Sequence, residues 1–231
     1  IEEYESTTNK IITPHKIKNL IGNRKKIFGG NSQNDSNEAL VFFFDIINTE
    51  FEKINIKDRL EDLIGITSNV NIKCKMKKCL KESEHKERNL ILNFILMDSL
   101  DDSYREYKNI IKLEGDDKYE CKNCDKKTIA RKKNDTVKWN NDIIISLNRF
   151  NNRLRKINKK INVPLEWRHG YKLVGGIIHS GDTLGGHYYY FGKKNNKWYI
   201  FNDSHLSKIE SNEELTNLLQ ISYILHYQKK I

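Results

Sequence analysis

A histidine and two polar residues near the C-terminus could together form a base and its orienting partner. His187 follows Gly185 and Gly186 at the start of a β-rich run, and Asn202 and Asp203 close the next run fifteen residues later. A hairpin of this length brings the end of one strand beside the start of the other. A carboxamide or carboxylate placed there can hold an imidazole in one tautomer for proton transfer. The spacing is therefore compatible with a histidine-centred acid–base site, although it is equally compatible with an ordinary strand histidine.

Four cysteines form the second group of residues that could do chemistry. They occur as two close pairs, Cys74-x4-Cys79 and Cys121-x2-Cys124, with 41 residues between the pairs. Zn²⁺ prefers four tetrahedral ligands, and two tight cysteine pairs on turns supply them without strain. Because four thiolates leave no open coordination position, the metal would be structural. The alternative is four reduced surface cysteines that bind nothing, and the spacing favours zinc.

Composition limits the class of protein. At 231 residues and a formal net charge of +10, the chain is long enough for one large core or two small ones. No apolar run approaches the roughly 18 residues of a membrane helix, so no membrane partner is expected. Paired cysteines without a signal peptide predict an intracellular protein of the cytoplasm or nucleus. The basic balance favours acidic partners. Nucleic acid is one such acidic partner, but it is a minority interpretation because the basic residues are spread along the chain.

Two helices are expected in the N-terminal part. The first begins at Thr13-Pro14, because Thr can cap a helix and Pro is tolerated in its first turn, and it ends at Gly22. The second follows a segment rich in capping residues and presents one broad apolar face. Residues 58–64 are expected to form a short linker or a strand. The apolar face of the second helix consists of Ala39, Phe42, Phe43, Ile46 and Ile47.

The remainder of the chain favours strands. A strand over 90–97 and a helix over 99–107 separate the cysteine pairs, and an apolar run over 143–150 suits a strand buried on both faces. A capping box at Ser211 to Glu214 opens a short helix, and alternating apolar residues from Ile221 to Tyr227 predict a final strand. A solvated basic hairpin, with an RNA-binding patch as the less favoured alternative, is expected for Arg153, Arg155, Lys156, Lys159 and Lys160.

The segment around His187 resembles the histidine box of the ubiquitin-specific proteases, a family of cysteine deubiquitinases. Residues 186–188 are similar to the family's Gly-His-Tyr, and residues 198–203 to its Trp-Tyr-x-Phe-Asn/Asp-Asp. A lone histidine is more often an ordinary strand residue, but both halves of the motif occur here in order. The resemblance implies that His187 is the general base, that Asn202 orients it and that Asp203 supports the site.

The segment before the second helix resembles the family's Gln-Gln-Asp-Ala-x-Glu-Phe box, with departures at Asn34, Ser36 and Ala39. In the family, this box faces the ubiquitin tail, which carries two arginines. Carboxylates hold such guanidinium groups well through paired, charge-assisted hydrogen bonds. The alternative is helix capping and dipole matching, at about 1 kcal/mol per cap. The tail-binding residues that the resemblance implies are Gln33, Asp35, Glu38, Gly186 and Tyr188.

The resemblance extends from about Thr13 to Tyr227 and implies an α+β fold of the papain-like cysteine protease type. Residues 1–65 would form a partial helical thumb with the glutamine box, residues 66–135 the zinc-bearing β fingers, and residues 136–231 an antiparallel β palm with the histidine box. These parts would belong to one catalytic domain, a monomer that acts on ubiquitin or ubiquitinated proteins. The zinc ligands would be Cys74, Cys79, Cys121 and Cys124.

The family's nucleophile is a cysteine upstream of the glutamine box, at the start of a helix whose dipole favours the thiolate. The cysteines of this chain all belong to the two pairs. Because the sequence begins with Ile1, we expect a C-terminal piece of a thiol protease whose nucleophile lies upstream. The alternatives are a catalytically inactive ubiquitin-binding module and, least favoured, a zinc-stapled basic domain for nucleic acid.

Overall fold

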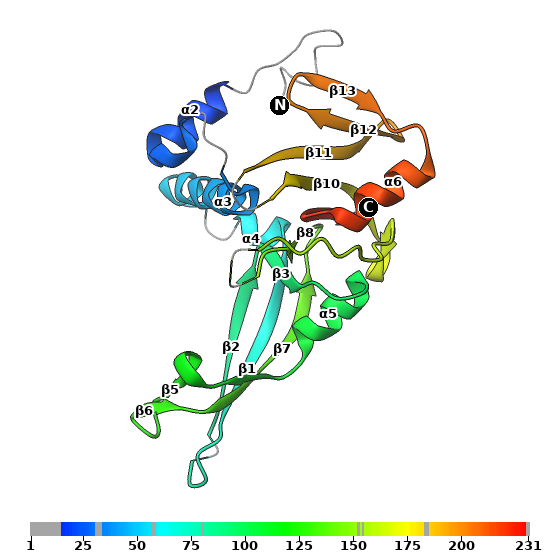
Figure 1. Ribbon diagram of the computed structural model, residues 1–231. Coiled ribbons are helices and arrows are strands. Elements are labelled where there is room, and N and C mark those ends of the chain that lie inside the picture. The colour runs from blue at the N-terminus through cyan, green and yellow to red at the C-terminus, as the bar shows by residue number, and fades with distance from the viewer. Residues whose placement is uncertain are drawn as a thin grey trace.

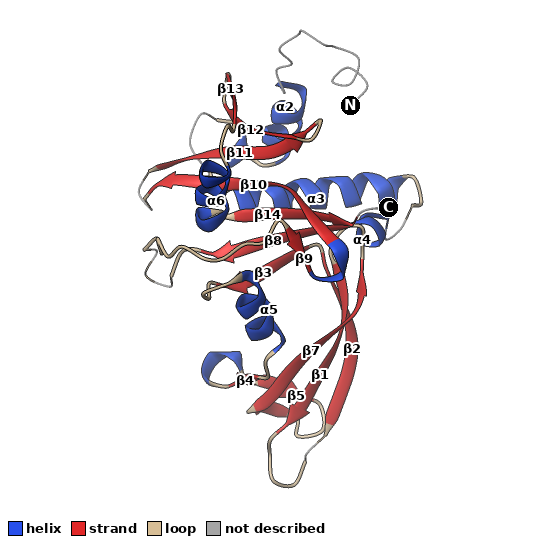
Figure 2. Cartoon of the chain, turned by 90° about the vertical axis from the view of Figure 1, so that its right-hand side faces the viewer, coloured by secondary structure: helices blue, strands red, loops and turns tan. Residues whose placement is uncertain are grey.

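The protein consists of a body, built on a large β-sheet, and a long arm, built on a smaller sheet that projects away from the body (Figures 1 and 2). Helices and mostly antiparallel strands confirm the expected α+β class. Within the described part of the chain, no helix combines the length and the apolar character needed to cross a membrane. The computed structural model describes residues 15–30, 34–56, 59–79, 81–151, 153, 155–182 and 185–229.

The sheet of the body contains eight strands: β3 (Ile91–Ile95), β8 (Asp142–Asn148), β9 (Glu166–Trp167), β10 (Tyr171–Gly181), β11 (Gly186–Lys194), β12 (Lys197–Asn202), β13 (His205–Lys208) and β14 (Ile224–Lys229). Their order is β13-β12-β11-β10-β14-β8-β3, with β9 paired beside β10. The strands are antiparallel except that β3 runs parallel to β8. The β-rich run expected to begin at His187 and the next run, expected to close at Asn202 and Asp203, are present as β11 and β12.

Helices cover both faces of this sheet, with α3 and α6 on opposite sides (Figure 2). The strand β8 explains how two cores form, because its alternate residues enter different clusters. Ile143 and Ile145 pack toward α6, whereas Ile144 packs with Phe44 of α3, so the strand is buried on both faces as expected. The helices are α2 (His15–Arg24), α3 (Ser36–Lys53), α4 (Arg59–Leu63), α5 (Leu100–Lys108) and α6 (Asn212–Ile221), with 3-10 turns η1 (Lys26–Phe28), η2 (Gly115–Asp117) and η3 (Arg168–Gly170).

The structure changes several expectations for the helices. The expected start at Thr13-Pro14 lies outside the described residues, and α2 does not stop at Gly22 but continues to Arg24. A Cβ on Gly22 would lie 2.4 Å from the Cα of Gly29, so this glycine permits a close backbone contact instead of ending the helix. The segment expected as a linker or strand contains α4, whose Leu60 is buried against α3.

The expected second helix is present as α3, but its buried face differs in detail from the predicted one. Phe44 is buried in the core, while Phe42 turns toward Phe28 and stacks on it with ring centroids 5.6 Å apart. The final strand is also shorter than expected, because Ile221 is the last residue of α6.

The arm is a four-stranded sheet with the order β2-β1-β7-β4, and a β5–β6 hairpin lies near its tip (Figure 1). The long strand β1 alternates buried and half-buried residues, as a strand with one packed face should. The edge strand β2 has mostly exposed, charged residues without apolar alternation, so sequence patterning does not reveal it. The bounds are β1 (Ile66–Cys74), β2 (Glu82–Asn89), β4 (Ile111–Leu113), β5 (Tyr119–Cys121), β6 (Lys126–Thr128) and β7 (Ala130–Trp139).

A buried arginine joins three segments of the body. The Arg149 guanidinium donates to the backbone carbonyls of Ser222 at 2.7 Å, Lys159 at 2.7 Å and Gln220 at 2.8 Å. Burial lowers the pKa of Arg149 to about 10, so the side chain stays charged at neutral pH. Two of these carbonyls belong to the C-terminal end of α6, where a cation is favoured by the helix dipole. Arg149 therefore fixes the end of α6, just before β14 begins.

We predict that Arg149→Met lowers the free energy of unfolding by about 3 kcal/mol, because buried carbonyls lose a charged donor. Urea denaturation of the purified chain measures this change. The matched control is Arg155→Met, at an exposed position, with an expected change below about 0.5 kcal/mol. Equal effects of the two substitutions would show that the guanidinium does not stabilise the body.

Candidate active site and cysteine cluster

A tight hairpin positions His187. The strands β11 and β12 are joined by Asn195 and Asn196, whose φ angles of 48° and 61° are both positive. Asparagine tolerates this conformation, which matches the two-residue turn that suits the twist of a hairpin. The ladder pairs Tyr190 with Phe201, so Asn202 lies diagonally across from His187 on the same face of the sheet.

The hairpin brings the imidazole of His187 into contact with the amide of Asn202. The His187 Nε2 atom lies 2.6 Å from the Asn202 Oδ1 atom. Because an amide oxygen only accepts hydrogen bonds, this contact requires a proton on Nε2 and leaves Nδ1 free to take up another. The Asp203 carboxylate is 3.7 Å from Nε2, too far for a hydrogen bond, and its side chain is 79% exposed. The expected contact at the strand ends is present, and the chemical roles of these residues stay predictions.

A second histidine, His179, packs next to the His187 site, and the sequence patterns did not reveal it. His179 is 7% exposed, and its ring packs against Phe150 and Tyr188 at centroid distances of 5.4 and 4.7 Å. A Cβ on Gly186 would lie 2.0 Å from the His179 Nε2 atom, so only glycine fits there. Close packing against the His179 ring thus explains why a glycine occupies position 186. The only signal for the packing role of His179 is the strand register, which places this residue opposite Tyr188.

Electrostatics favour a neutral His179. Burial and the nearby charge of Lys156 lower the pKa of its imidazole. The Lys156 ammonium donates to the backbone carbonyls of His179 and Gly181, both at 2.8 Å. This residue therefore ties the basic segment to the end of β10, which corrects the expectation that it is simply solvated.

The carboxylate of Asp35 connects α3 to the sheet. One oxygen, Oδ1, accepts hydrogen bonds from the backbone amides of Asn37 at 2.8 Å and Glu38 at 3.0 Å, which caps the helix. The other, Oδ2, accepts from the hydroxyls of Tyr188 at 3.0 Å and Tyr223 at 2.8 Å. Burial, and next the charge and hydrogen bonding of Asp35, raise the pKa of both tyrosines well above the usual range. Contact with an arginine would require one of these four donors to move.

The other described residues predicted to bind a ubiquitin tail are divided between α3 and β11. Glu38 is exposed and pairs with the Lys25 ammonium at 2.6 Å. Gly186 and Tyr188 flank His187 on β11, and Gln33 lies outside the described residues. Of the residues predicted to bind a ubiquitin tail, the structure therefore brings the side chains of Asp35 and Tyr188 into a direct hydrogen bond.

The four cysteines converge at the tip of the arm. Their Sγ atoms all lie within 4.8 Å of one another. The Cys79–Cys121 and Cys74–Cys124 sulfur pairs are 3.7 and 4.0 Å apart, far longer than the ~2.05 Å of a disulfide. A tetrahedral zinc site with Zn–S bonds of ~2.3 Å has sulfur–sulfur edges of ~3.8 Å. The donor set and its spacing therefore fit a tetrahedral metal ion.

Hydrogen bonds prepare some of these thiols for metal binding. The backbone amide of Lys81 lowers the pKa of the Cys79 thiol to about 6, and the Thr128 hydroxyl lowers that of Cys74. Hydrogen bonding with the Cys79 sulfur raises the pKa of the Cys124 thiol to about 12. Four thiolates this close repel one another, and a bound cation removes that repulsion.

The His187–Asn202 pair and the cysteine cluster lie at opposite ends of the molecule. The hairpin β5–β6 marks the tip of the arm, whereas β11 lies on the far side of the body (Figure 1). Because the sequence contains four cysteines and all four belong to the cluster, no thiol of this chain lies beside His187.

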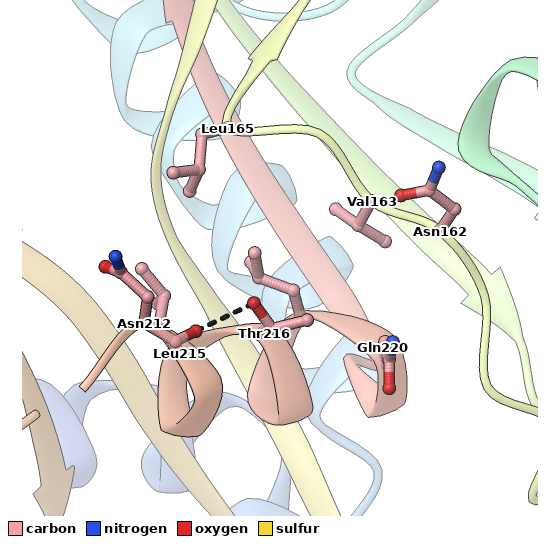
Figure 3. A pocket seen from close by; sticks show the side chains of 8 residues that line it. Asn162, Val163, Leu165, Asn212, Leu215, Thr216 and Gln220 are labelled. Atoms are coloured by element: carbon pink, nitrogen blue, oxygen red, sulfur yellow. Dashed lines mark hydrogen bonds between the residues drawn. The ribbon is translucent and has the colours of Figure 1, made fainter.

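A separate cavity of about 300 Å³ lies between α6 and the segment 162–165 (Figure 3). Its lining is apolar or neutral: Leu215 and Val163 face it together with the amides of Asn162 and Gln220. The Thr216 hydroxyl donates to a carbonyl of its own helix at 2.7 Å. The residues that line this cavity include no carboxylate, histidine or cysteine.

Comparison with known sequences assigns the family. The profile of the ubiquitin carboxyl-terminal hydrolases matches residues 2–227, and the chain belongs to this family. It is 28% identical over 246 residues to Ubiquitin carboxyl-terminal hydrolase 16 of Arabidopsis thaliana, covering 94% of this chain and 24% of that protein. It is 32% identical over 148 residues to Probable ubiquitin carboxyl-terminal hydrolase 16 of Schizosaccharomyces pombe, covering 57% and 32%. The resemblance to ubiquitin-specific proteases is thereby confirmed.

A viral protein is also similar to this chain. Probable ubiquitin carboxyl-terminal hydrolase R319 of Acanthamoeba polyphaga mimivirus is 31% identical over 147 residues, which cover 54% of this chain and 30% of that protein. The chain thus spans about a quarter to a third of the length of these relatives.

We predict that Asp35→Ala lowers the free energy of unfolding by about 3 kcal/mol, because it removes a helix cap and the acceptor of two buried hydroxyls. The control Glu38→Ala, one turn along, removes only an exposed ion pair and should cost no more than about 1 kcal/mol. Urea denaturation measures both values. Asp35→Ala and Tyr223→Phe should also be non-additive, because the two residues share one hydrogen bond. If Asp35→Ala costs no more than Glu38→Ala, this network does not connect α3 to the sheet.

Proposed function

We propose that this chain is the histidine-bearing part of a thiol-dependent deubiquitinase. Its reaction would be hydrolysis of isopeptide or peptide bonds after the C-terminal glycine of ubiquitin. The observation that carries the proposal is the contact between His187 and Asn202, in a chain of the ubiquitin carboxyl-terminal hydrolase family. The names of its relatives as hydrolases support the same reaction class.

In the proposed mechanism, His187 moves protons and Asn202 fixes its tautomer. With Nε2–H held by the Asn202 oxygen, Nδ1 takes the proton of a cysteine thiol. The thiolate attacks the glycine carbonyl carbon, the carbon–nitrogen bond breaks, and His187 returns the proton to the leaving lysine amine. A water molecule, deprotonated by the same imidazole, then cleaves the thioester and restores the thiol. Asp203, 3.7 Å away, would stabilise the imidazolium only through its charge.

This mechanism requires a nucleophile from outside the 231 residues. The cysteines of the chain are gathered at the tip of the arm, so the reacting thiol would come from an upstream segment of the same gene. In this proposal, residues 1–65 belong to a helical thumb, residues 66–135 form the fingers and residues 136–231 form the palm. The ubiquitin tail would run past Glu38, Gly186 and Tyr188 toward His187.

We further propose that the cysteine cluster binds one structural Zn²⁺. Cys74, Cys79, Cys121 and Cys124 supply four sulfur atoms at distances that suit a tetrahedron. Such an ion would order the tip of the arm and take no part in hydrolysis, because four thiolates occupy its coordination positions.

A second candidate function is ubiquitin binding without catalysis. The observation that favours it is the absence of a thiol beside His187. A binding module would still use the α3 and β11 surfaces, and its affinity for ubiquitin would not depend on His187 as a base.

The first test extends the chain with the upstream segment of its gene. We expect the extended protein to react with ubiquitin that carries a C-terminal electrophile and to cleave ubiquitin chains. His187→Ala should reduce cleavage about 10²- to 10⁴-fold, the usual contribution of a general base, and Asn202→Ala should reduce it less. The matched control is the exposed His205, whose replacement by Ala should leave cleavage unchanged.

The outcomes of this test separate the two functions. An extended protein that binds ubiquitin but stays inert would replace the protease with the inactive binding module. The chain of 231 residues itself should not react with the electrophile.

The second test measures metal. We expect one zinc ion per chain in protein kept reduced throughout, and Cys124→Ala should abolish it. Hydrogen exchange should then become faster in β1 and β7 but stay slow in β10 and β11, because the body has its own core. Asn123→Ala, which removes only a hydrogen bond of 3.3 Å to the Cys79 sulfur, is the control and should retain zinc. Clearly substoichiometric zinc in the unaltered chain would overturn the assignment.

A further inference from the structure

Lysines along the shaft of the arm are neutralised by neighbouring carboxylates. Five lysines of this sheet have a carboxylate oxygen within 3.1 Å of their ammonium nitrogen. Paired charges of this kind present little net potential to a partner. These five residues are Lys73, Lys112, Lys132, Lys133 and Lys138.

The tip of the arm is different. We call residues 75–81 and 122–127 the tip loops; they contain one cysteine of each pair, Cys79 and Cys124, and seven lysines against one acidic residue, Asp125. Among the residues that the structure describes, none of these lysines lies within ion-pair distance of a carboxylate. The charges are therefore concentrated, and the acidic residues that border the loops balance only part of them: Lys73 and, more weakly, Lys75 lower the pKa of the Glu82 carboxyl, and Lys127 lies opposite Glu120 on the neighbouring strand. In the sequence the basic residues look spread along the chain, because the two loops are 41 residues apart and only the fold brings them together.

Charge compensation for a metal does not account for so many lysines. A Zn²⁺ ion with four thiolate ligands carries a net charge of two negative units, which leaves an excess of positive charge on the tip loops. Four of the lysines line an open cavity of about 570 Å³ next to the cluster: Lys75, Lys77, Lys78 and Lys126. Because the sulfur atoms of Cys79 and Cys124 lie within 4.8 Å of each other, the two loops lie side by side and their lysines form one cationic surface.

We propose that the tip loops bind the phosphate backbone of nucleic acid. Duplex DNA carries one negative charge per ~1.7 Å of its axis, so one duplex can contact several lysines at once. An acidic peptide fits less well, because the tip loops contain no arginine for bidentate carboxylate binding, and Met76 is their only large apolar side chain exposed among the described residues. Recognition would be independent of base sequence, because lysine acts here as a point charge.

This surface is separate from the proposed hydrolase site. The tip and β11 lie at opposite ends of the molecule, so nucleic acid and a ubiquitin tail would not compete (Figure 1). The proposal depends on the charges and geometry of the arm and does not rest on the proposed hydrolysis. Binding would localise the protein on a polyanion while His187 stays accessible.

Fluorescence anisotropy with a labelled 20-base-pair DNA duplex of mixed sequence tests the proposal on the zinc-loaded chain. Three or four phosphate contacts predict that log K falls against log[salt] with a slope of about −3. The tip variant replaces Lys75, Lys77, Lys78 and Lys126 by Gln, and we expect it to bind about tenfold more weakly or worse at 50 mM salt.

The control variant has the same net charge but an intact tip. It replaces Lys16, Lys193, Lys197 and Lys229 by Gln, all exposed and away from the arm, and it should lose less than about twofold in affinity. Zinc content and circular dichroism are compared for both variants. If the tip variant loses zinc, Lys81→Gln with Lys127→Gln replaces it, with an expected loss of about threefold.

Three results would overturn the proposal. The first is undetectable duplex binding by the unaltered chain at 50 mM salt. The second is an equal loss of affinity in the tip and control variants, which would assign binding to net charge alone. The third is binding of a 20-residue glutamate peptide as tight as that of the duplex, which would assign the surface to an acidic protein partner.

Discussion

The antiparallel register of β10, β11 and β12 is the constraint on which the His187 site depends. Because side chains alternate between the faces of a strand, a slip of one residue between β11 and β12 would move His187 away from Asn202 to the opposite face. The Asn195-Asn196 turn fixes one end of this register. Packing of Gly186 on His179 fixes the other end, because no larger residue fits there.

The His187 site and the cysteine cluster are held in place by different interactions. The body surrounds its sheet with two apolar clusters, so the placement of His187 relies on burial and on a continuous ladder. The outer half of the arm has only a small cluster, in which Val70, Ile72 and Ala130 are buried. Such a cluster contributes little free energy, so the proposed zinc ion would supply much of the order at the tip.

Sequence patterns predicted those features that depend on short-range spacing. The hairpin contact of His187 and the buried strand β8 follow from local spacing and periodicity. The convergence of the cysteine pairs was predicted from the preference of a metal ion for four ligands, although the pairs are 41 residues apart. The hydrogen bonds of Asp35 to Tyr188 and Tyr223 join residues 153 and 188 positions apart, and no local pattern encodes them. Strand β2 escaped prediction for a related reason. Its charged residues show no period, and only pairing with β1 makes it a strand.

The charged character of β2 has a consequence for the behaviour of the protein at high concentration. A long sheet that projects into solvent exposes unpaired backbone groups along its outer strands, and these could pair with a second molecule. On one side, β2 forms the outer edge and carries glutamate, lysine and arginine side chains, so that pairing with a copy edge to edge would crowd charged groups together. On the other side, β4 is only three residues long and offers too few groups to template a new strand. The arm can thus extend far from the body without promoting fibre-like self-assembly.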